Sequence, residues 1–239
     1  MGTVFSFVTL VATEHQTTVR AAIGEAAAWL HEVDRRFTTF ADDSEWMDYA
    51  RGELALDDAH PDVRHVVQRA AQLGRDTHGA FSLTADHSRL PDPAAYVKGW
   101  AVQRAAGLVL GGRAESVLVN GGGDLMVTRR AVPWRIGIQD PHHPAGLAAV
   151  VEIEHGAVAT SGAYQRGGHV FDPASGRPSD ALASATVVGP DLGLADAYST
   201  ALFACGEVGL EWFRSLDGYG AYLIRQDGST VAAGAIRLS

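Results

Sequence analysis

The segment SVLVNGGGDLMVT, residues 116–128, opens a run of short, β-branched strands that decides the fold. The segments WRIGIQ, AVVEIE and AVAT follow it, separated by Gly, Pro or Asp residues. Helices are predicted before this run, and one further helix, residues 194–206, is predicted between two later strands. Because helices and strands are segregated instead of alternating, the sequence predicts an α+β fold, with residues 1–239 forming a single domain.

The N-terminal part of the sequence predicts three helices. Apolar residues recur at spacings of three and four over about residues 17–33, which is the pattern of an amphipathic helix. A second helix is expected to begin near Pro61, because proline suits the first helical turn. A third is expected over KGWAVQRAAGLVL, residues 98–110, and ends at the glycines that follow. At the other end of the chain, a closing hairpin is predicted around residues 227–228.

The composition restricts the kinds of partner. The formal net charge is -9, which repels nucleic acid and anionic lipid, so neither is expected as a partner. No stretch approaches the roughly 18 apolar residues that a transmembrane helix needs, and the first residues lack the features of a secretory leader. We therefore expect a cytoplasmic protein. The single cysteine, Cys205, excludes an intrachain disulfide and lies in an apolar stretch that favours an unreactive thiol.

Two segments are candidates for binding an anion. In VNGGGDLMV, residues 119–127, three successive glycines let backbone amides approach a ligand; a tight hairpin turn explains the same glycines equally. Lys98, at the predicted start of a helix, places a positive charge beside amides that attract phosphate. An ordinary solvated lysine is the alternative. An acidic chain that binds a nucleotide needs such local compensation of charge.

Two further segments offer groups for catalysis or metal binding. In ATSGAYQRGGHVFDPASGRP, residues 159–178, His169 follows two glycines and is able to transfer a proton near neutral pH; the alternative is a structural role. Asp196 and Thr200 are four residues apart, so a helix places both oxygens on one face, and such a pair suits Mg²⁺. The alternative is that Asp196 caps the helix and Thr200 bonds back to a carbonyl.

The order of these segments along the chain is similar to that of one protein family. The sequence contains, in this order, RRFTTFADDSE, GAFSLT, VKGWAV, NGGGDL, IGIQDP, ATSGAY, HVFDPASGRP and ADAYSTAL. Over roughly residues 1–206 they resemble the ApbE-type flavin transferases. The most specific parts are TSG, the H-x-x-DP-x-x-G-x-P pattern that follows it, and the ADAxxT helix.

This resemblance implies a fold in which helices pack on mixed or antiparallel sheets and FAD lies in a cleft between two halves. It implies an enzyme that transfers FMN from FAD to a Ser or Thr hydroxyl of a partner flavoprotein and releases AMP, with Mg²⁺ bound. The implied metal ligands are the Ala95 carbonyl and the side chains of Asp196 and Thr200. The implied catalytic groups are His169 as a base, or Asp196 assisting near the metal. The residues implied to line the nucleotide are Met1, Thr38, Thr39, Phe40, Ala80, Phe81, Lys98, Gly122 and His169, with Asp124 shaping the pocket.

The sequence departs from the family pattern in three places. Ser82 stands where the family usually has an aspartate, and Val97 replaces a small residue before Lys98. Only a short linker, residues 84–92, stands where relatives carry a longer segment. A second subunit of a homodimer is one way to complete the adenosine side of the FAD pocket. A flavin-binding module without chemistry and an FAD pyrophosphatase that gives FMN and AMP are therefore kept as alternatives.

Overall fold

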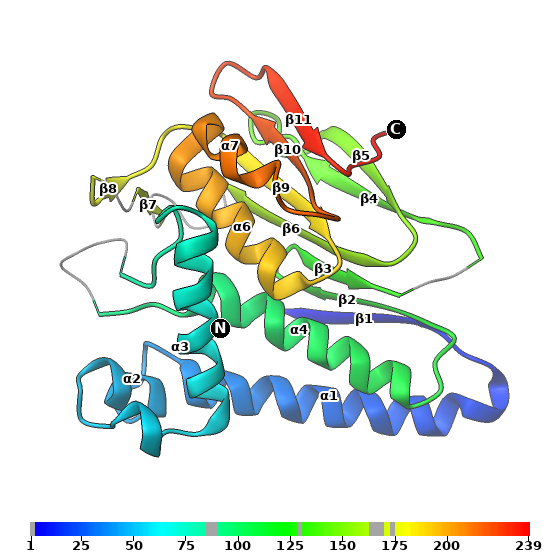
Figure 1. Ribbon diagram of the computed structural model, residues 1–239. Helices are drawn as coiled ribbons and strands as arrows, with labels where there is room; N and C mark the ends of the chain where they lie inside the picture. The colour runs from blue at the N-terminus through cyan, green and yellow to red at the C-terminus, as the bar shows by residue number, and fades with distance from the viewer. Residues whose placement is uncertain (1–2, 85–89, 129–130, 163–169, 173–174) are drawn as a thin grey trace.

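A seven-stranded antiparallel sheet forms the centre of the molecule in the computed structural model, which describes residues 3–84, 90–128, 131–162, 170–172 and 175–239. The strand order is β1-β2-β3-β6-β9-β10-β11, and every neighbouring pair is antiparallel (Figure 1). These strands are β1 (Phe5–Leu10), β2 (Ser116–Gly121), β3 (Asp124–Val127), β6 (Gly156–Gly162), β9 (Ser184–Gly189), β10 (Gly220–Ile224) and β11 (Thr230–Gly234).

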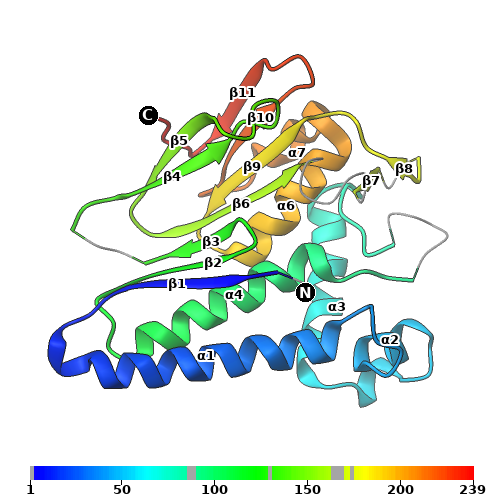
Figure 2. The ribbon, with the colours of Figure 1, turned by 180° about the vertical axis from the view of Figure 1, so that it is seen from behind.

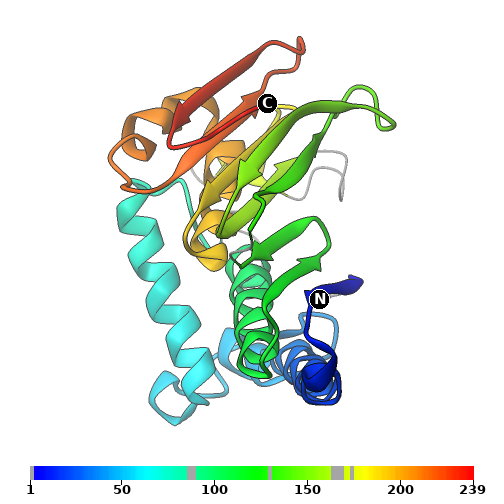
Figure 3. The same ribbon diagram turned by 90° about the vertical axis from the view of Figure 1, so that its right-hand side faces the viewer.

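Helices cover one face of this sheet. The longer ones are α1 (Gln16–Phe37), α3 (Pro61–Asp76), α4 (Ala94–Gly111) and α6 (Leu192–Cys205), and the short ones are η1 (Thr13–His15), α2 (Glu45–Ala50), η2 (Leu56–Asp58), η3 (Gly206–Gly209) and α7 (Leu210–Phe213). Helix α4 packs on β2 and β3, and α6 packs on β6 and β9. Helix α1 lies alongside α4, below β1 in the view of Figure 1 (Figures 1 and 3). The larger hydrophobic core fills the space between these helices and the sheet.

The opposite face of the sheet carries a β-hairpin instead of helices. It consists of β4 (Trp134–Gln139) and β5 (Leu147–Ile153), which lie across this face in the view from behind (Figure 2). A second, smaller core joins the hairpin to the sheet, with Ile138 and Val151 facing Val158 and Tyr222. A separate two-stranded ladder pairs β7 (Phe171–Asp172) with β8 (Arg177–Pro178). The predicted α+β class is confirmed, and the pairing is antiparallel throughout the described strands.

The observed helix ends differ from the predicted ones where ion pairs or caps extend the helix. Helix α1 continues to Phe37 because Arg36, which is buried, bonds Glu32 in the preceding turn and also Asp62 at the start of α3. Helix α4 begins four residues before the predicted start, where the Ala94 amide donates to Oδ1 of Asp92. Helix α2 is not among the predicted helices, because its six residues are too few for a periodic signal.

Ser44 is the N-terminal cap of α2. Its side chain accepts a hydrogen bond from the Met47 amide, and its hydroxyl donates to the carbonyl of Thr38 at 2.6 Å. This bond fixes the segment after α1, which contains three of the residues predicted to line a nucleotide.

None of the helices within the described ranges combines the length and the apolar character required to cross a bilayer.

Candidate active site

Lys98 lies between two buried carboxylates where α4, β3 and α6 meet. Its Nζ is 2.6 Å from Oδ2 of Asp124 and 3.8 Å from Oδ1 of Asp196. The Asp124 and Asp196 side chains are 1% and 4% exposed, whereas Lys98 is 18% exposed. Lys98 is also the only lysine in the sequence. Removing two carboxylates from water is costly and adds little stability even when they are paired, so this cluster has the character of a functional site.

Two glycines allow α4 and α6 to approach closely enough to form this cluster. A Cβ at Gly99 would lie 2.4 Å from the carbonyl oxygen of Leu192, and a Cβ at Gly193 would lie 2.9 Å from the ring of Tyr96. The amide of Gly99 donates to Oδ2 of Asp196 at 3.2 Å. The glycine in the V-K-G-W segment therefore sets the position of the carboxylate relative to the first turns of α4.

Asp124 is held by the β-hairpin that contains the three glycines. Gly121 pairs with Asp124, and Gly122 and Gly123 have φ angles of 64° and 98°, so they form a two-residue turn. The hairpin explanation of this segment is thus confirmed. Oδ1 of Asp124 accepts a hydrogen bond from the Thr160 amide at 3.2 Å, which leaves Oδ2 facing Lys98.

The predicted metal-binding pair occupies the middle of α6. Asp191, not Asp196, caps this helix, since its Oδ1 accepts from the Leu194 amide at 2.8 Å. The alternative in which Asp196 is the cap is therefore wrong. Asp196 and Thr200 follow at the spacing of one helical turn, which places their oxygens on one face. Asp196 lies beside the turn of α4 that starts at Ala95, because it contacts the amide of Gly99 four residues later.

These oxygens are suited to a hard cation. Within the described ranges, no group of three or more His, Cys, Asp or Glu side chains is arranged to hold a metal. The predicted ligands instead combine one carboxylate with a hydroxyl and a carbonyl oxygen. Mg²⁺ accepts such a set because it retains waters and takes further ligands from substrate phosphate. The predicted ligands fit this description. Asp196 supplies a buried carboxylate, Thr200 a hydroxyl one helical turn away, and Ala95 lies at the nearby start of α4.

The residues predicted to line the nucleotide lie in several places. Thr38 follows the end of α1, and Phe40, two residues on, is 91% exposed, so its ring is available to a ligand. Phe81 is 3% exposed, with its ring in the larger core and its amide bonded to the Thr77 hydroxyl. Gly122 faces Thr3, whose Oγ1 lies 2.4 Å from where a Cβ would stand. Met1 and His169 lie outside the described residues. The roles of Thr38, Thr39, Phe40, Ala80, Phe81 and Gly122 stay predictions.

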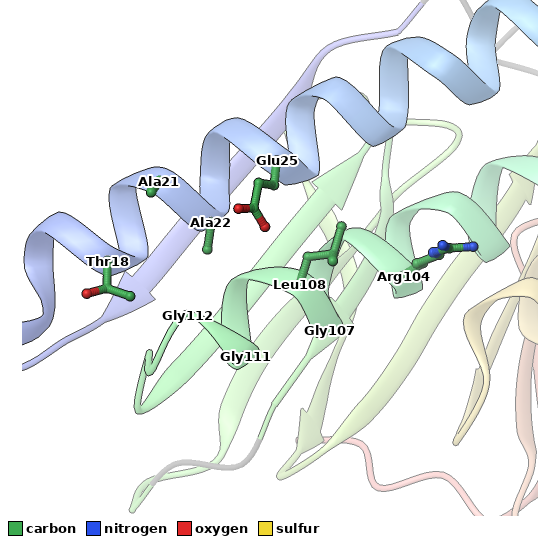
Figure 4. Close-up of a pocket in the computed structure, with 9 residues that line it drawn as sticks. All are labelled: Thr18, Ala21, Ala22, Glu25, Arg104, Gly107, Leu108, Gly111 and Gly112. Atoms are coloured by element: carbon green, nitrogen blue, oxygen red, sulfur yellow. The ribbon is translucent and has the colours of Figure 1, made fainter.

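A groove in the described part of the structure lies away from this cluster. It has a volume of about 600 Å³ and lies between α1 and the second half of α4 (Figure 4). Its lining is mostly small, including Ala21, Ala22 and Gly107, with Glu25 and Arg104 as its charged members. No residue predicted to bind the nucleotide or the metal lines this groove.

Burial changes the acidity of two groups on α6. Desolvation raises the pKa of the Tyr198 phenol, which therefore keeps its proton near neutral pH. Burial also raises the pKa of the Cys205 thiol. A thiol with a raised pKa is a poor nucleophile, in agreement with the unreactive cysteine expected from the sequence.

The arrangement of sheet, hairpin and helices is the fold of flavin transferase structures. The structure of the Pseudomonas stutzeri flavinyl transferase ApbE, apo form, superimposes with a TM-score of 0.83 and 24% identity, over 98% of this chain and 92% of that one. The flavin transferase ApbE from Vibrio cholerae superimposes with a TM-score of 0.79 and 22% identity, over 98% and 94% of the two chains. At these identities the likeness establishes the fold alone.

The sequence establishes the family. The model of the ApbE family matches residues 1–89 and 91–223, so this chain belongs to the ApbE family. Two curated relatives are both named FAD:protein FMN transferase. That of Rhodobacter capsulatus is 35% identical over 158 residues, or 61% of this chain, and that of Treponema pallidum (strain Nichols) is 29% identical over 167 residues, also 61%. The matched parts cover 30% and 46% of these relatives, which is less than half of their length.

Proposed function

We propose that this protein is an Mg²⁺-dependent FAD:protein FMN transferase, which moves FMN from FAD to a Ser or Thr hydroxyl of an acceptor flavoprotein and releases AMP. The observation that carries the proposal is the buried Lys98–Asp124–Asp196 cluster, with Thr200 one helical turn from Asp196. Membership of the ApbE family and the names of the curated relatives support it.

The charge balance of the molecule fits a diphosphate substrate. The chain has a formal net charge of -9, so an anionic dinucleotide needs local positive charge to bind. Lys98 lies near the start of α4, where backbone amides also favour anions. Because its ammonium is shared between Asp124 and Asp196, the additional positive charge would have to come from a bound cation. A divalent metal held by Ala95, Asp196 and Thr200 would neutralise the diphosphate and polarise the phosphorus under attack.

The reaction needs a group that accepts the proton of the acceptor hydroxyl. That oxygen forms a bond to the phosphorus of the FMN moiety, the bond from this phosphorus to the bridging oxygen breaks, and AMP leaves with that oxygen. His169 is proposed as the base, because an imidazole is suited to this transfer near neutral pH. An His169→Ala protein is expected to lose transfer while it retains FAD. If that variant transfers FMN at the rate of the unaltered protein, His169 is not the base.

The proposal is tested by incubating the protein with FAD and Mg²⁺, with and without a flavoprotein domain that a characterised member of the family modifies. A transferase produces AMP and covalent flavin only when the acceptor is present. AMP with free FMN in the absence of acceptor identifies a pyrophosphatase instead. FAD that binds but stays intact in both incubations identifies a flavin-binding module, and either of these results contradicts the proposal.

FAD binding at the cluster is tested separately with an amine label. Because Lys98 is the only lysine, trinitrobenzenesulfonate can modify a single side-chain amine, and peptide mapping separates it from the α-amino group. FAD with Mg²⁺ is expected to slow modification of Lys98. Equal rates with and without FAD would place the nucleotide elsewhere. A homodimer and a cytoplasmic location stay predictions.

A further inference from the structure

The hydroxyl of Ser161 lies between two hydroxyls of α6. Its Oγ is 2.9 Å from Oγ of Ser199 and 3.1 Å from Oγ1 of Thr200. Ser161 is 8% exposed and Ser199 is fully buried, whereas Thr200 is partly exposed. Ser161 continues the alternation of Ala157 and Ala159 on the face of β6 that α6 covers. A serine at this position of an otherwise apolar face is the signal in the sequence for a polar contact with α6.

Only one direction of proton donation satisfies this set of hydroxyls. The Ser199 hydroxyl is 2.9 Å from the Asp196 carbonyl, which can only accept, so the Ser199 proton is committed to it. Ser199 Oγ must then accept from Ser161, whose single proton is used in that bond. The contact between Ser161 and Thr200 therefore requires Thr200 to donate and Ser161 to accept.

This order determines what Thr200 offers to its surroundings. A threonine within a helix commonly donates to the carbonyl four residues earlier, but here that carbonyl belongs to Asp196 and accepts from Ser199. With its proton directed to Ser161, the Thr200 oxygen presents lone pairs to the site. A hydroxyl ligand of Mg²⁺ needs this arrangement, because the cation binds the oxygen and repels the proton.

We infer that Ser161 and Ser199 are positioning residues, which order the Thr200 proton so that its oxygen is preset as a ligand for a divalent cation. The inference rests on the metal site of the proposed function. Ser161 and Ser199 themselves need not touch the cation. They act as the outer-shell partners of metal ligands do, by fixing the orientation of the group that binds.

The test uses Mn²⁺ as a spectroscopic probe for Mg²⁺, with free Mn²⁺ measured by electron paramagnetic resonance on the full chain. Ser161→Ala is expected to weaken Mn²⁺ binding about tenfold, within the range typical of outer-shell partners. Ser199→Ala is expected to weaken Mn²⁺ binding at least as much. In this variant Ser161 is free to donate its proton to Thr200, and the Thr200 proton then turns toward the cation. In Ser161→Ala/Ser199→Ala that reversal is impossible, so the double variant is expected to match Ser161→Ala.

A matched control removes a different hydroxyl pair from the same strands. Thr186→Val eliminates the 2.9 Å contact between Thr160 and Thr186, which lie in β6 and β9. This variant is expected to bind Mn²⁺ like the unaltered protein. Thermal unfolding without metal identifies any variant that fails to fold. In FAD turnover, Ser161→Ala is expected to need about ten times more Mn²⁺ for half-maximal rate, with little change in the rate at saturating Mn²⁺.

The outcomes separate this inference from the proposed function. If Asp196→Asn loses Mn²⁺ binding while folded Ser161→Ala and Ser199→Ala bind it normally, the metal site stands and the positioning role is wrong. Additive losses in the double variant would also overturn it, because they indicate independent packing effects. If the unaltered protein binds no Mn²⁺ in the presence of FAD, the proposed function and this inference both fail.

Discussion

The two ends of α4 differ in what they offer to a ligand. The first turns contain Lys98 and Gly99 and meet α6, where two carboxylates are buried around one ammonium group. The second half faces α1 across a groove of about 600 Å³ with a lining of mostly small residues (Figure 4). The first region is closely packed and rich in charge, and the second is hollow and has few polar groups. The burial of three charged groups together therefore identifies the first region as the candidate site.

The largest effect is expected from Asp196→Asn. This substitution keeps the shape of the side chain and an acceptor for the Gly99 amide, but it removes the negative charge that a cation requires. Metal-dependent release of AMP is expected to fall by at least about 100-fold, since even outer-shell partners are typically worth 10- to 100-fold. Release is measured by chromatography of the nucleotides.

A carboxylate elsewhere on the same helix provides the control. Asp191→Asn retains a capping side chain at the start of α6, so turnover is expected to stay close to that of the unaltered protein. Loss of activity in both variants would mean that α6 as a whole, and not Asp196, is sensitive to substitution.

Lys98→Met is expected to have the next largest effect, on stability as well as on FAD binding. The substitution removes the ammonium group that pairs with the Asp124 carboxylate, 1% exposed, and breaking a buried pair in this way costs about 3 kcal/mol. Chemical denaturation measures the loss of stability. The paired variant Lys98→Met/Asp124→Asn is expected to recover part of that stability but not the affinity for FAD. Recovery of both would show that Lys98 has no direct role toward the nucleotide.

The smallest effects distinguish the two ends of α4 with a single added methyl group. Gly99→Ala places a Cβ 2.4 Å from the Leu192 carbonyl, so α4 and α6 must separate, at an expected cost of about 1 to 3 kcal/mol and with reduced turnover. Gly107→Ala meets nothing within 4 Å and is expected to stabilise the helix by about 0.5 to 1 kcal/mol with unchanged turnover. Thermal unfolding and AMP release measure both. Reduced FAD binding in Gly107→Ala would indicate that FAD binds in the groove between α1 and α4.

Local patterns predicted most of the fold because local rules decide most of its elements. The strands from residue 116 to 162, the proline at the start of α3 and the glycine turn between β2 and β3 all follow from short-range chemistry. Helix α2 was missed because six residues are too few for a periodic signal, and the end of α1 depends on an ion pair between Arg36 and Asp62, far apart in sequence.

The site was predicted in part for the same reason. The spacing of Asp196 and Thr200 is local and was recognised, whereas the pairing of Lys98 with Asp124 depends on how α4 packs on β3. The contacts of Ser161 with α6 join residues 38 and 39 positions apart. Such pairs carry no signal in a single sequence beyond a polar residue on an apolar face, and only the assembled fold brings them together.

The distance along the chain between the two halves of the cluster has a consequence for biosynthesis. Gly99 and the carboxylate it contacts are separated by 97 positions, and α4 is the earlier of the two helices. A growing polypeptide that has completed α4 therefore lacks the proposed cation site until α6 has left the ribosome and docked. Long-range contacts of this kind form slowly, so uptake of metal at the proposed site would report that the nascent chain has finished assembling its core.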